Sequence, residues 1–463
     1  MNEKLLILLI VIALVLRLNF MGQWLEDWDS VQLALGLHEY SLLKHQPHPP
    51  GYPIYTLMGK FFLFFLRDDR LVLTVMSAIF GALAALPLYL LVRKIFNKNL
   101  AFLASVILLL IPVEWLLSES ALTDIVGLFF LILVGFLFFK YSEDKSKTLF
   151  VSFLAGLSIG VRFNEFPVIL GLLFWVIIKQ KNLRSAILQG LSFSLGVLLW
   201  LIPVILITGW NNFIYIYLDS GSYVVAHDLL LGQNHSLLGL IKLKLLQIVH
   251  LSNLGFSLPL GILFLVSLFW SLFQRQLYTK AWYQFSLIWL VSYSVLLLTF
   301  FNLELPRHLL PLTVPILLII IYAISQLWKK TKLSLAIPLI LILVLTYQSF
   351  SQVYRFQNSL PAMIAPVLYV KQNFSPKDTI VYSSFTLRSF SYYAPEFRTI
   401  DNKGDKSVIT KDKTIILDHI DLKKDPALST FEEVSSPFFS ADKDIFPKVD
   451  SIQLHIMKYK KSG

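Results

Sequence analysis

The chain has no cysteine among its 463 residues, so it can form no disulfide, no thiolate metal site and no cysteine nucleophile. Charged residues are also scarce, at 15% of the chain against 56% hydrophobic residues. A soluble domain carries about 25% charged residues, so this composition excludes that class and indicates a membrane protein. Because cysteines give no indication of compartment, the side on which each loop lies has to come from topology.

Several short motifs are absent as well. The sequence contains no GxGxxG, no GxxxxGK[ST] phosphate-binding loop and no HExxH, and its histidines lack the spacing of a tetrahedral zinc site. Matched Gly-rich broken helices, which are typical of secondary transporters, are missing too. The formal net charge of +11 does not indicate a nucleic-acid partner, because Lys and Arg lie in short loops between apolar segments.

Apolar runs recur from Leu5 to Phe350, and about 20 such residues suffice to cross a bilayer. The first run lacks a small-residue cleavage site, so we expect an uncleaved span. The segment 52–66 is short and contains Lys60, so we expect it to lie in the interface. Eleven spans then place the basic loops in the cytoplasm and the C-terminus outside. The expected spans are 4–21, 71–92, 98–117, 121–139, 148–161, 165–178, 185–208, 254–274, 281–301, 308–328 and 333–350.

The fifth and sixth spans are short. A re-entrant hairpin in their place would leave all later loops on the same sides of the membrane. Two expected outer loops, 22–70 and 209–253, are too long to be simple connectors and should hold interfacial helices. We expect a transmembrane domain over 1–352 and a small extracytoplasmic α/β domain over 353–463, where the composition becomes charged and mixed. Within that domain, a helix is expected over 361–373 and strands over 378–385, 413–420 and 451–459.

Ionisable residues near the expected spans collect on the outer side, and their cost in hydrocarbon makes their positions informative. Carboxylates opposed by Arg and His can deprotonate an acceptor hydroxyl and stabilise a departing phosphate. Either Asp29 or Asp27 is the candidate general base, and a solvated interfacial pair is the plain alternative. The other candidates are His48, Lys60, Glu119, Asp124, Arg162, Arg307 and His308. The plain alternative is that they are ordinary loop residues or interfacial anchors whose charged ends reach toward water.

Five short segments occur in an order and at positions that resemble one known family. They are Asp27-Trp28-Asp29-Ser30, His48-Pro49-Pro50-Gly51-Tyr52-Pro53, Arg93-Lys94-Ile95-Phe96, the acidic stretch 119–124 and Pro306-Arg307-His308-Leu309-Leu310-Pro311. The family is the GT-C glycosyltransferases, in particular the branch of protein O-mannosyltransferases and of aminoarabinose transferases that modify lipid A. Where that family has Asp-Glu, this chain has Asp29-Ser30, which makes Asp29 the better match for the base.

The resemblance implies a GT-C fold and an inverting glycosyltransferase in the cytoplasmic membrane, with its site on the outer face. A polyprenyl-phosphate sugar would enter from the bilayer, and a hydroxyl of a protein, lipid or glycan would accept the sugar. His48 would lie near the carrier phosphate, and Arg162, Arg307, His308 and Lys60 would bind the phosphate or its lipid.

No cofactor follows from the sequence, and the resemblance leaves a divalent metal open, because some relatives bind one and others do not. Two other functions stay open. An oligosaccharide ligase would depend on Arg307 and His308 more than on Asp29. A flippase or transporter would need functional charges at mid-bilayer. The sequence does not name the sugar, the acceptor or the length of the carrier.

Overall fold

The computed structural model describes residues 3–227, 237–300, 303, 305–329, 335–401 and 404–460. The chain divides into two compact units. The first comprises Met1–Met21 and Gly36–Tyr354, and the second comprises Gly22–Leu35 and Arg355–Gly463. Residues 22–35, which the sequence assigns to the transmembrane domain, therefore cluster with the C-terminal domain.

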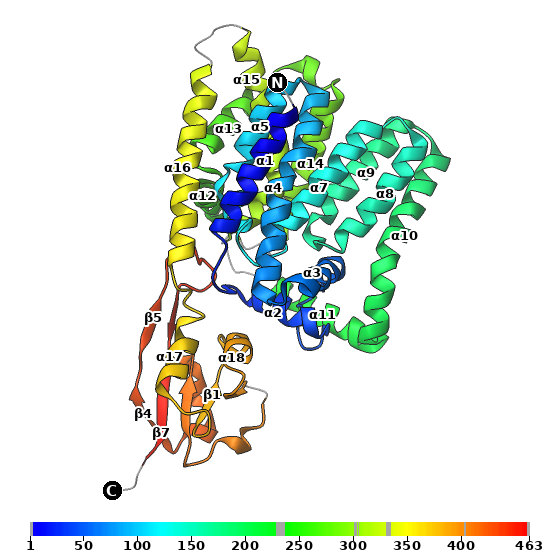
Figure 1. Ribbon diagram of the computed structural model, residues 1–463. Coiled ribbons are helices and arrows are strands. Elements are labelled where there is room, and N and C mark those ends of the chain that lie inside the picture. Colours follow the sequence, from blue (N-terminus) through cyan, green and yellow to red (C-terminus); the bar gives the residue numbers. More distant parts are fainter. Residues whose placement is uncertain are drawn as a thin grey trace. The chain divides into compact units, whose positions relative to one another are not determined.

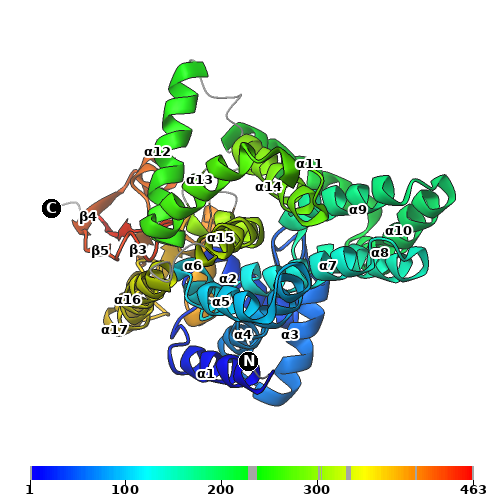
Figure 2. The ribbon, with the colours of Figure 1, turned by 90° about the horizontal axis from the view of Figure 1, so that it is seen from above.

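The first unit is built from helices that run side by side (Figure 1). Helix α4 packs against α1, α3, α5 and α7, while α8, α9 and α10 contact one another and form one side of the unit, as the view from above also shows (Figure 2). The helices from α1 to α9 are α1 (Glu3–Asn19), α2 (Trp28–His38), α3 (Pro53–Leu66), α4 (Asp69–Ile95), α5 (Lys98–Leu109), α6 (Pro112–Leu117), α7 (Asp124–Tyr141), α8 (Lys145–Ile159), η1 (Phe163–Glu165) and α9 (Phe166–Gln180). They are followed by α10 (Leu183–Thr208), α11 (Trp210–His227), α12 (Leu237–Phe256), α13 (Leu258–Leu272), η3 (Arg275–Leu277), α14 (Ala281–Phe300), η4 (Pro306–Leu312), α15 (Thr313–Trp328) and α16 (Ala336–Asn358).

Every one of the expected spans contains a helix, and the mostly helical, multi-pass fold is confirmed. Seven helices in the described part of the chain are long and apolar enough to cross a membrane. An eighth is added if α12 and α13, which bend by 115° at their junction, form one span. Helices α1, α5 and α8 have only 17, 12 and 15 residues, so the count of eleven stays a prediction.

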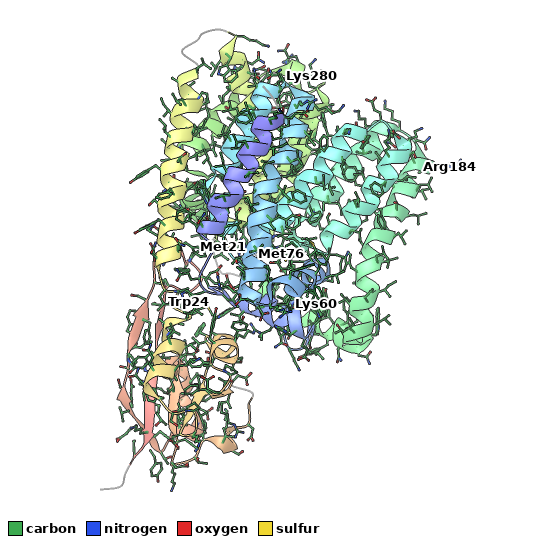
Figure 3. The ribbon with its side chains drawn as sticks, in the orientation of Figure 1. Met21, Trp24, Lys60, Met76, Arg184 and Lys280 are labelled. Atoms are coloured by element: carbon green, nitrogen blue, oxygen red, sulfur yellow. The ribbon has the colours of Figure 1, made fainter. Side chains whose placement is uncertain are left out.

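The two ends of this unit can be told apart by their charges. An ion pair of 3.0 Å between Glu3 and Arg93 joins the start of α1 to the end of α4. At the other end of α1, the rings of Phe20 and Phe350 lie 5.6 Å apart, so α1 and α16 run in the same direction. Figure 3 shows Arg184 and Lys280 at the end where α1 begins, and Lys60 and Met76 toward the other end. Arg93, Arg184 and Lys280, from three of the basic loops, thus lie at the end where α1 begins, as the topology expected from the sequence requires.

Helices α8 and α10 approach each other through glycines. A Cβ at Gly156 would collide with the backbone of Phe193, and one at Gly196 with the backbone of Phe153. The indole of Trp200 donates a hydrogen bond of 3.0 Å to the carbonyl of Gly156. Small residues let membrane helices pack closely where no hydrophobic force draws them together, so these glycines set the spacing of the pair.

The second unit contains a five-stranded sheet in the order β2-β1-β3-β7-β4. Strand β1 is parallel to β2 and β3, and β7 is antiparallel to β3 and β4. Alternation of side chains places Ile380 and Tyr382 in one buried cluster and Val381 in another, so both faces of the sheet are covered. The elements are α17 (Ala365–Asn373), β1 (Thr379–Tyr382), α18 (Leu387–Tyr393), β2 (Arg398–Ile400), β3 (Thr414–Leu417), β4 (Phe431–Ser435), β5 (Phe438–Ser440), β6 (Ser451–Gln453) and β7 (His455–Tyr459).

We expect Gly156→Ala to destabilise the helical unit, because its methyl group has no space against the backbone of α10. Overpacking of this kind costs about 1–3 kcal/mol. Gly190→Ala, on the same α10, is the matched control because nothing lies within 4 Å of its Cβ position. Thermal unfolding of the purified protein in detergent should show a lower midpoint for Gly156→Ala only. Equal midpoints for both variants would contradict this packing.

The charge distribution also predicts the side on which the C-terminal domain lies. Because α16 ends opposite the basic loops, a reporter active only outside the cytoplasm should work when fused after Gly463. A second fusion within the loop between α10 and α9, after Lys181, should be inactive with the same reporter. Fluorescence of a cytoplasm-only reporter after Gly463 would contradict the eleven-span topology.

Candidate functional site

The turn between α8 and α9 carries a buried ion pair. Arg162 Nη2 lies 2.6 Å from Asp124 Oδ1, at the start of α7, and Arg162 Nη1 donates a hydrogen bond of 2.7 Å to the hydroxyl of Thr123. The side chains of Arg162 and Asp124 are only 9% and 3% exposed. Charges at such depth persist only when they are paired, so this contact fixes the turn against α7.

A second carboxylate, Glu165, joins this pair. It is buried, it lies within electrostatic range of Arg162, and neither of its carboxylate oxygens has a hydrogen-bond partner in the described part of the chain. A Cβ at Gly127 would come within 2.6 Å of Glu165 Oε1 and 2.7 Å of Arg162 Cδ, so glycine makes room for both side chains. Tyr293, from α14, interacts electrostatically with all three charged groups.

The proline-rich segment is attached to the same turn. The backbone amide of Ile54 donates a hydrogen bond of 3.0 Å to the carbonyl of Gly160. Gly51 has a φ of +98°, and a Cβ there would collide with the hydroxyl of Tyr40. Glycine is therefore required between the prolines and α3, because other residues rarely adopt this backbone conformation.

Within this segment, Tyr52 links His48 to the cluster of Arg162, Asp124 and Glu165. His48 Nε2 lies 3.0 Å from the hydroxyl of Tyr52, and Tyr52 is within electrostatic range of Arg162. Arg307 is within range of Arg162 as well, and the carbonyl of His308 accepts a hydrogen bond of 2.9 Å from Tyr293. The structure thus gathers Asp124, His48, Arg162, Arg307 and His308 around one place.

Glu119 does not join them. Its Oε1 accepts a hydrogen bond of 2.7 Å from the indole of Trp115, and Trp115 lies beneath the guanidinium of Arg17. Arg17 in turn forms a buried ion pair of 2.5 Å with Glu114. The acidic stretch expected to act as one region is therefore divided, with Glu119 in this second cluster and Asp124 beside Arg162.

Lys60 lies on the exposed face of α3, next to an apolar cavity. The cavity has a volume of about 290 Å³ and is lined by Leu57 and Lys60 from α3 and by Trp200 and Pro203 from α10, among others. Trp200 also lines a neighbouring apolar cavity of about 470 Å³. These cavities, with one lysine at their edge, suit a long hydrocarbon chain that carries a charged head.

The acidic loop belongs to the second unit. Asp27 precedes α2 and accepts a hydrogen bond of 2.9 Å from the backbone amide of Asp29, as an N-cap does. Ser30 donates a hydrogen bond of 2.7 Å to the carbonyl of Asp27. Lys448 lies 2.7 Å from Asp27 Oδ1 and 3.3 Å from Asp29 Oδ1. Partial burial lowers the pKa of Arg388, and the nearby Asp29 carboxylate acts in the opposite direction.

The residues at the acidic loop do not fit a divalent metal. In the parts of the chain that the structure describes, no three His, Asp or Glu side chains are grouped so as to hold an ion. The two aspartates of the loop share the ammonium group of Lys448 instead. No step proposed below uses a metal.

Sequence reasoning missed Tyr293 and Lys448 as parts of these clusters. Glu165 follows Arg162 by three residues at the same expected membrane boundary, so the sequence places it among the outer ionisable residues, although not as a site residue. Lys448 is separated from the acidic loop by more than 400 residues, and no local pattern marks it.

Comparison with known proteins adds two findings. Residues 47–210 match the family described as dolichyl-phosphate-mannose-protein mannosyltransferase. Two crystal structures of ArnT from Cupriavidus metallidurans share the fold at 11% sequence identity and a TM-score of 0.60. The one bound to undecaprenyl phosphate is matched over 98% of this chain and 97% of that chain, and the apo one over 98% of both. Among curated proteins no match was found.

We expect Arg162→Met to destabilise the protein strongly, because it leaves Asp124 and Glu165 buried without their cation. Breaking a buried pair from one side costs on the order of 3–5 kcal/mol. Arg184→Met is the control, since that arginine is exposed at the start of α10. The double variant Arg162→Met/Asp124→Asn should recover part of the loss. Equal unfolding midpoints for Arg162→Met and Arg184→Met would contradict the role of the pair.

Proposed function

The chain has the fold of the GT-C glycosyltransferases and matches their mannosyltransferase branch over residues 47–210, and from this premise we propose that it transfers a sugar from a polyprenyl-phosphate carrier to an acceptor hydroxyl. The observation that carries the proposal is the gathering of Arg162, Arg307 and His48 in the helical unit. The matched family uses a lipid-phosphate sugar, and the ArnT structure holds undecaprenyl phosphate. The acceptor is a protein, a lipid or a glycan outside the cytoplasm.

Two guanidinium groups near each other favour an anion. Arg162 and Arg307 repel one another, and Arg162 is paired with the buried carboxylate of Asp124. A phosphate diester beside Arg307 and His48 would accept charge-assisted hydrogen bonds from them, in surroundings that screen charge weakly. These groups would therefore bind the donor phosphate and stabilise it as it departs.

The lipid part of the donor would lie along α3 and α10. The cavities that share Trp200 are apolar, and exposed Leu57, Phe61 and Phe64 continue that surface along α3. A polyprenyl chain gains free energy by contacting such side chains, at about 25 cal/mol per Å² buried. Lys60 would attract the phosphate to the edge of this surface.

Asp29 is the general base of the proposed reaction. Asp27 Oδ1 accepts from the backbone amide of Asp29 and so has a structural task, whereas the Asp29 carboxylate takes no part in that cap. In the transfer, the acceptor oxygen bonds to the anomeric carbon, the bond from that carbon to the phosphate oxygen breaks, and Asp29 takes the hydroxyl proton. Attack opposite the leaving phosphate inverts the anomeric centre.

We expect Asp29→Asn to lower turnover by on the order of 10²–10⁴, because the amide keeps the shape of the side chain but cannot accept the proton. Asp27→Asn should cost less, since asparagine also caps helices well. The assay is sugar transfer in nanodiscs from a panel of synthetic polyprenyl-phosphate sugars, with binding of undecaprenyl phosphate measured separately. That binding should stay nearly unchanged in both variants.

The outcomes separate the competing functions. If Asp27→Asn is inactive while Asp29→Asn transfers at the wild-type rate, the two aspartates have exchanged roles. If both aspartate variants are active but Arg307→Met and His308→Ala are not, a ligase is favoured. If transfer is undetectable with every donor while the lipid binds and crosses the bilayer, the protein is a flippase and the proposal is wrong.

A further inference from the structure

We propose that the C-terminal domain positions the acidic loop for the transfer reaction, with Lys448 as the positioning residue for Asp29. The proposal rests on the proposed function, in which Asp29 is the base. It assigns to the C-terminal domain a role in catalysis through contacts that all lie within the second unit.

The first observation is the shared ammonium group. Lys448 Nζ contacts one oxygen of Asp27 at 2.7 Å and one oxygen of Asp29 at 3.3 Å. All three side chains are largely buried, with exposed fractions of 27%, 12% and 20% for the lysine and the two aspartates, so water screens the contact only in part. Two carboxylates in one turn of a helix repel each other, and the ammonium group of Lys448 contacts both, while Arg388 lies within electrostatic range of Asp29.

The second observation is the anchoring of Trp28, which stands between the two aspartates. Its indole donates a hydrogen bond of 2.7 Å to the carbonyl of Phe385, and the rings of Trp28 and Phe385 are stacked at 5.9 Å. Lys448 Nζ lies 5.2 Å from the centre of the Trp28 ring. The backbone amide of Leu25 donates a further hydrogen bond of 2.8 Å to the hydroxyl of Tyr393. The loop is therefore held at Leu25, before the two aspartates, at Trp28, between them, and by Lys448, which contacts both.

The third observation is that the turn holding Trp28 is itself fixed. Asp418, at the end of β3 and only 4% exposed, accepts five hydrogen bonds from the turn 383–386. The donors are the hydroxyls of Ser383 and Thr386, at 2.6 and 2.9 Å, and the amides of Ser384, Phe385 and Thr386, at 2.8, 2.8 and 2.6 Å. A buried carboxylate that is saturated by donors makes this turn rigid. Rigid support of this kind is what a reacting group needs, since a displacement of about 1 Å costs roughly 10²-fold in rate.

The test compares Lys448→Met with Lys448→Arg and with Lys443→Met in the full chain in nanodiscs. Lys443 is the matched control, because it is a lysine of the same segment that is 77% exposed and pairs with Asp450 at 3.6 Å. Hydrogen–deuterium exchange of the peptide covering 22–35 reports the loop without reference to activity. Transfer kinetics with the donor panel and binding of undecaprenyl phosphate report the reaction.

For Lys448→Met we expect faster exchange in 22–35 and a kcat lowered by about 10²-fold, with binding of undecaprenyl phosphate unchanged. Lys448→Arg should recover most of kcat, because it keeps the charge, and Lys443→Met should resemble wild type. Trp28→Phe keeps an aromatic side chain but removes the donor to Phe385, so it should act in the same direction with a smaller effect.

Wild-type exchange and kcat in Lys448→Met would overturn the proposal, and so would a loosened loop with an unchanged kcat. A failure of the proposed function has a different signature, because Asp29→Asn would then transfer at the wild-type rate. In that event, faster exchange in Lys448→Met would still support the attachment of the loop, and unchanged exchange would overturn it.

Discussion

The ion pair between Arg162 and Asp124 is the contact on which the polar end of the helical unit depends. It joins the turn after α8 to the start of α7, and the proline-rich segment is attached to the same turn through Ile54 and Gly160. Burying an arginine at membrane depth costs free energy. The absence of a side chain at Gly127 leaves the space that Arg162 occupies. A fold that needed only stability would place apolar side chains here, because well-packed apolar groups often replace buried pairs at no loss. The pair instead fixes the turn after α8 against α7 through an ion pair and a hydrogen bond to Thr123.

The acidic loop follows a different physical rule. Its carboxylates stand at the start of α2, where the backbone amides of a helix are unsatisfied and negative charge is stabilised. Asp27 satisfies one of these amides, and Lys448 then contacts both carboxylates. Asp27 thus holds the start of α2, and both carboxylates share the ammonium group of Lys448.

The sequence predicts what depends on long apolar runs and on alternation along the chain. Each expected span contains a helix, and the strands β1, β3 and β7 lie within their expected segments, because hydrophobic periodicity is a local property. The topology expected from the sequence also places Arg162, Arg307 and His48 at the same end of the spans. Strands β2 and β5 have three residues each and β4 contains two glutamates, so they carry little apolar signal. The sequence does not show that Glu119 accepts a hydrogen bond from Trp115, four residues before it, and so lies apart from Asp124.

No local sequence pattern predicts the contact of Lys448 with the acidic loop. This contact joins residues 22–35 to the C-terminal domain. Residues 22–35 lie in the chain between α1 and the segment that leads to α3, yet side chains of the C-terminal domain contact them. The turn that holds Trp28 is itself fixed by the buried carboxylate of Asp418. Loops carry function when a rigid scaffold positions them, and here the scaffold of a loop near the N-terminus is encoded at the other end of the chain. The C-terminal domain is therefore part of the structure that sets the geometry of Asp29.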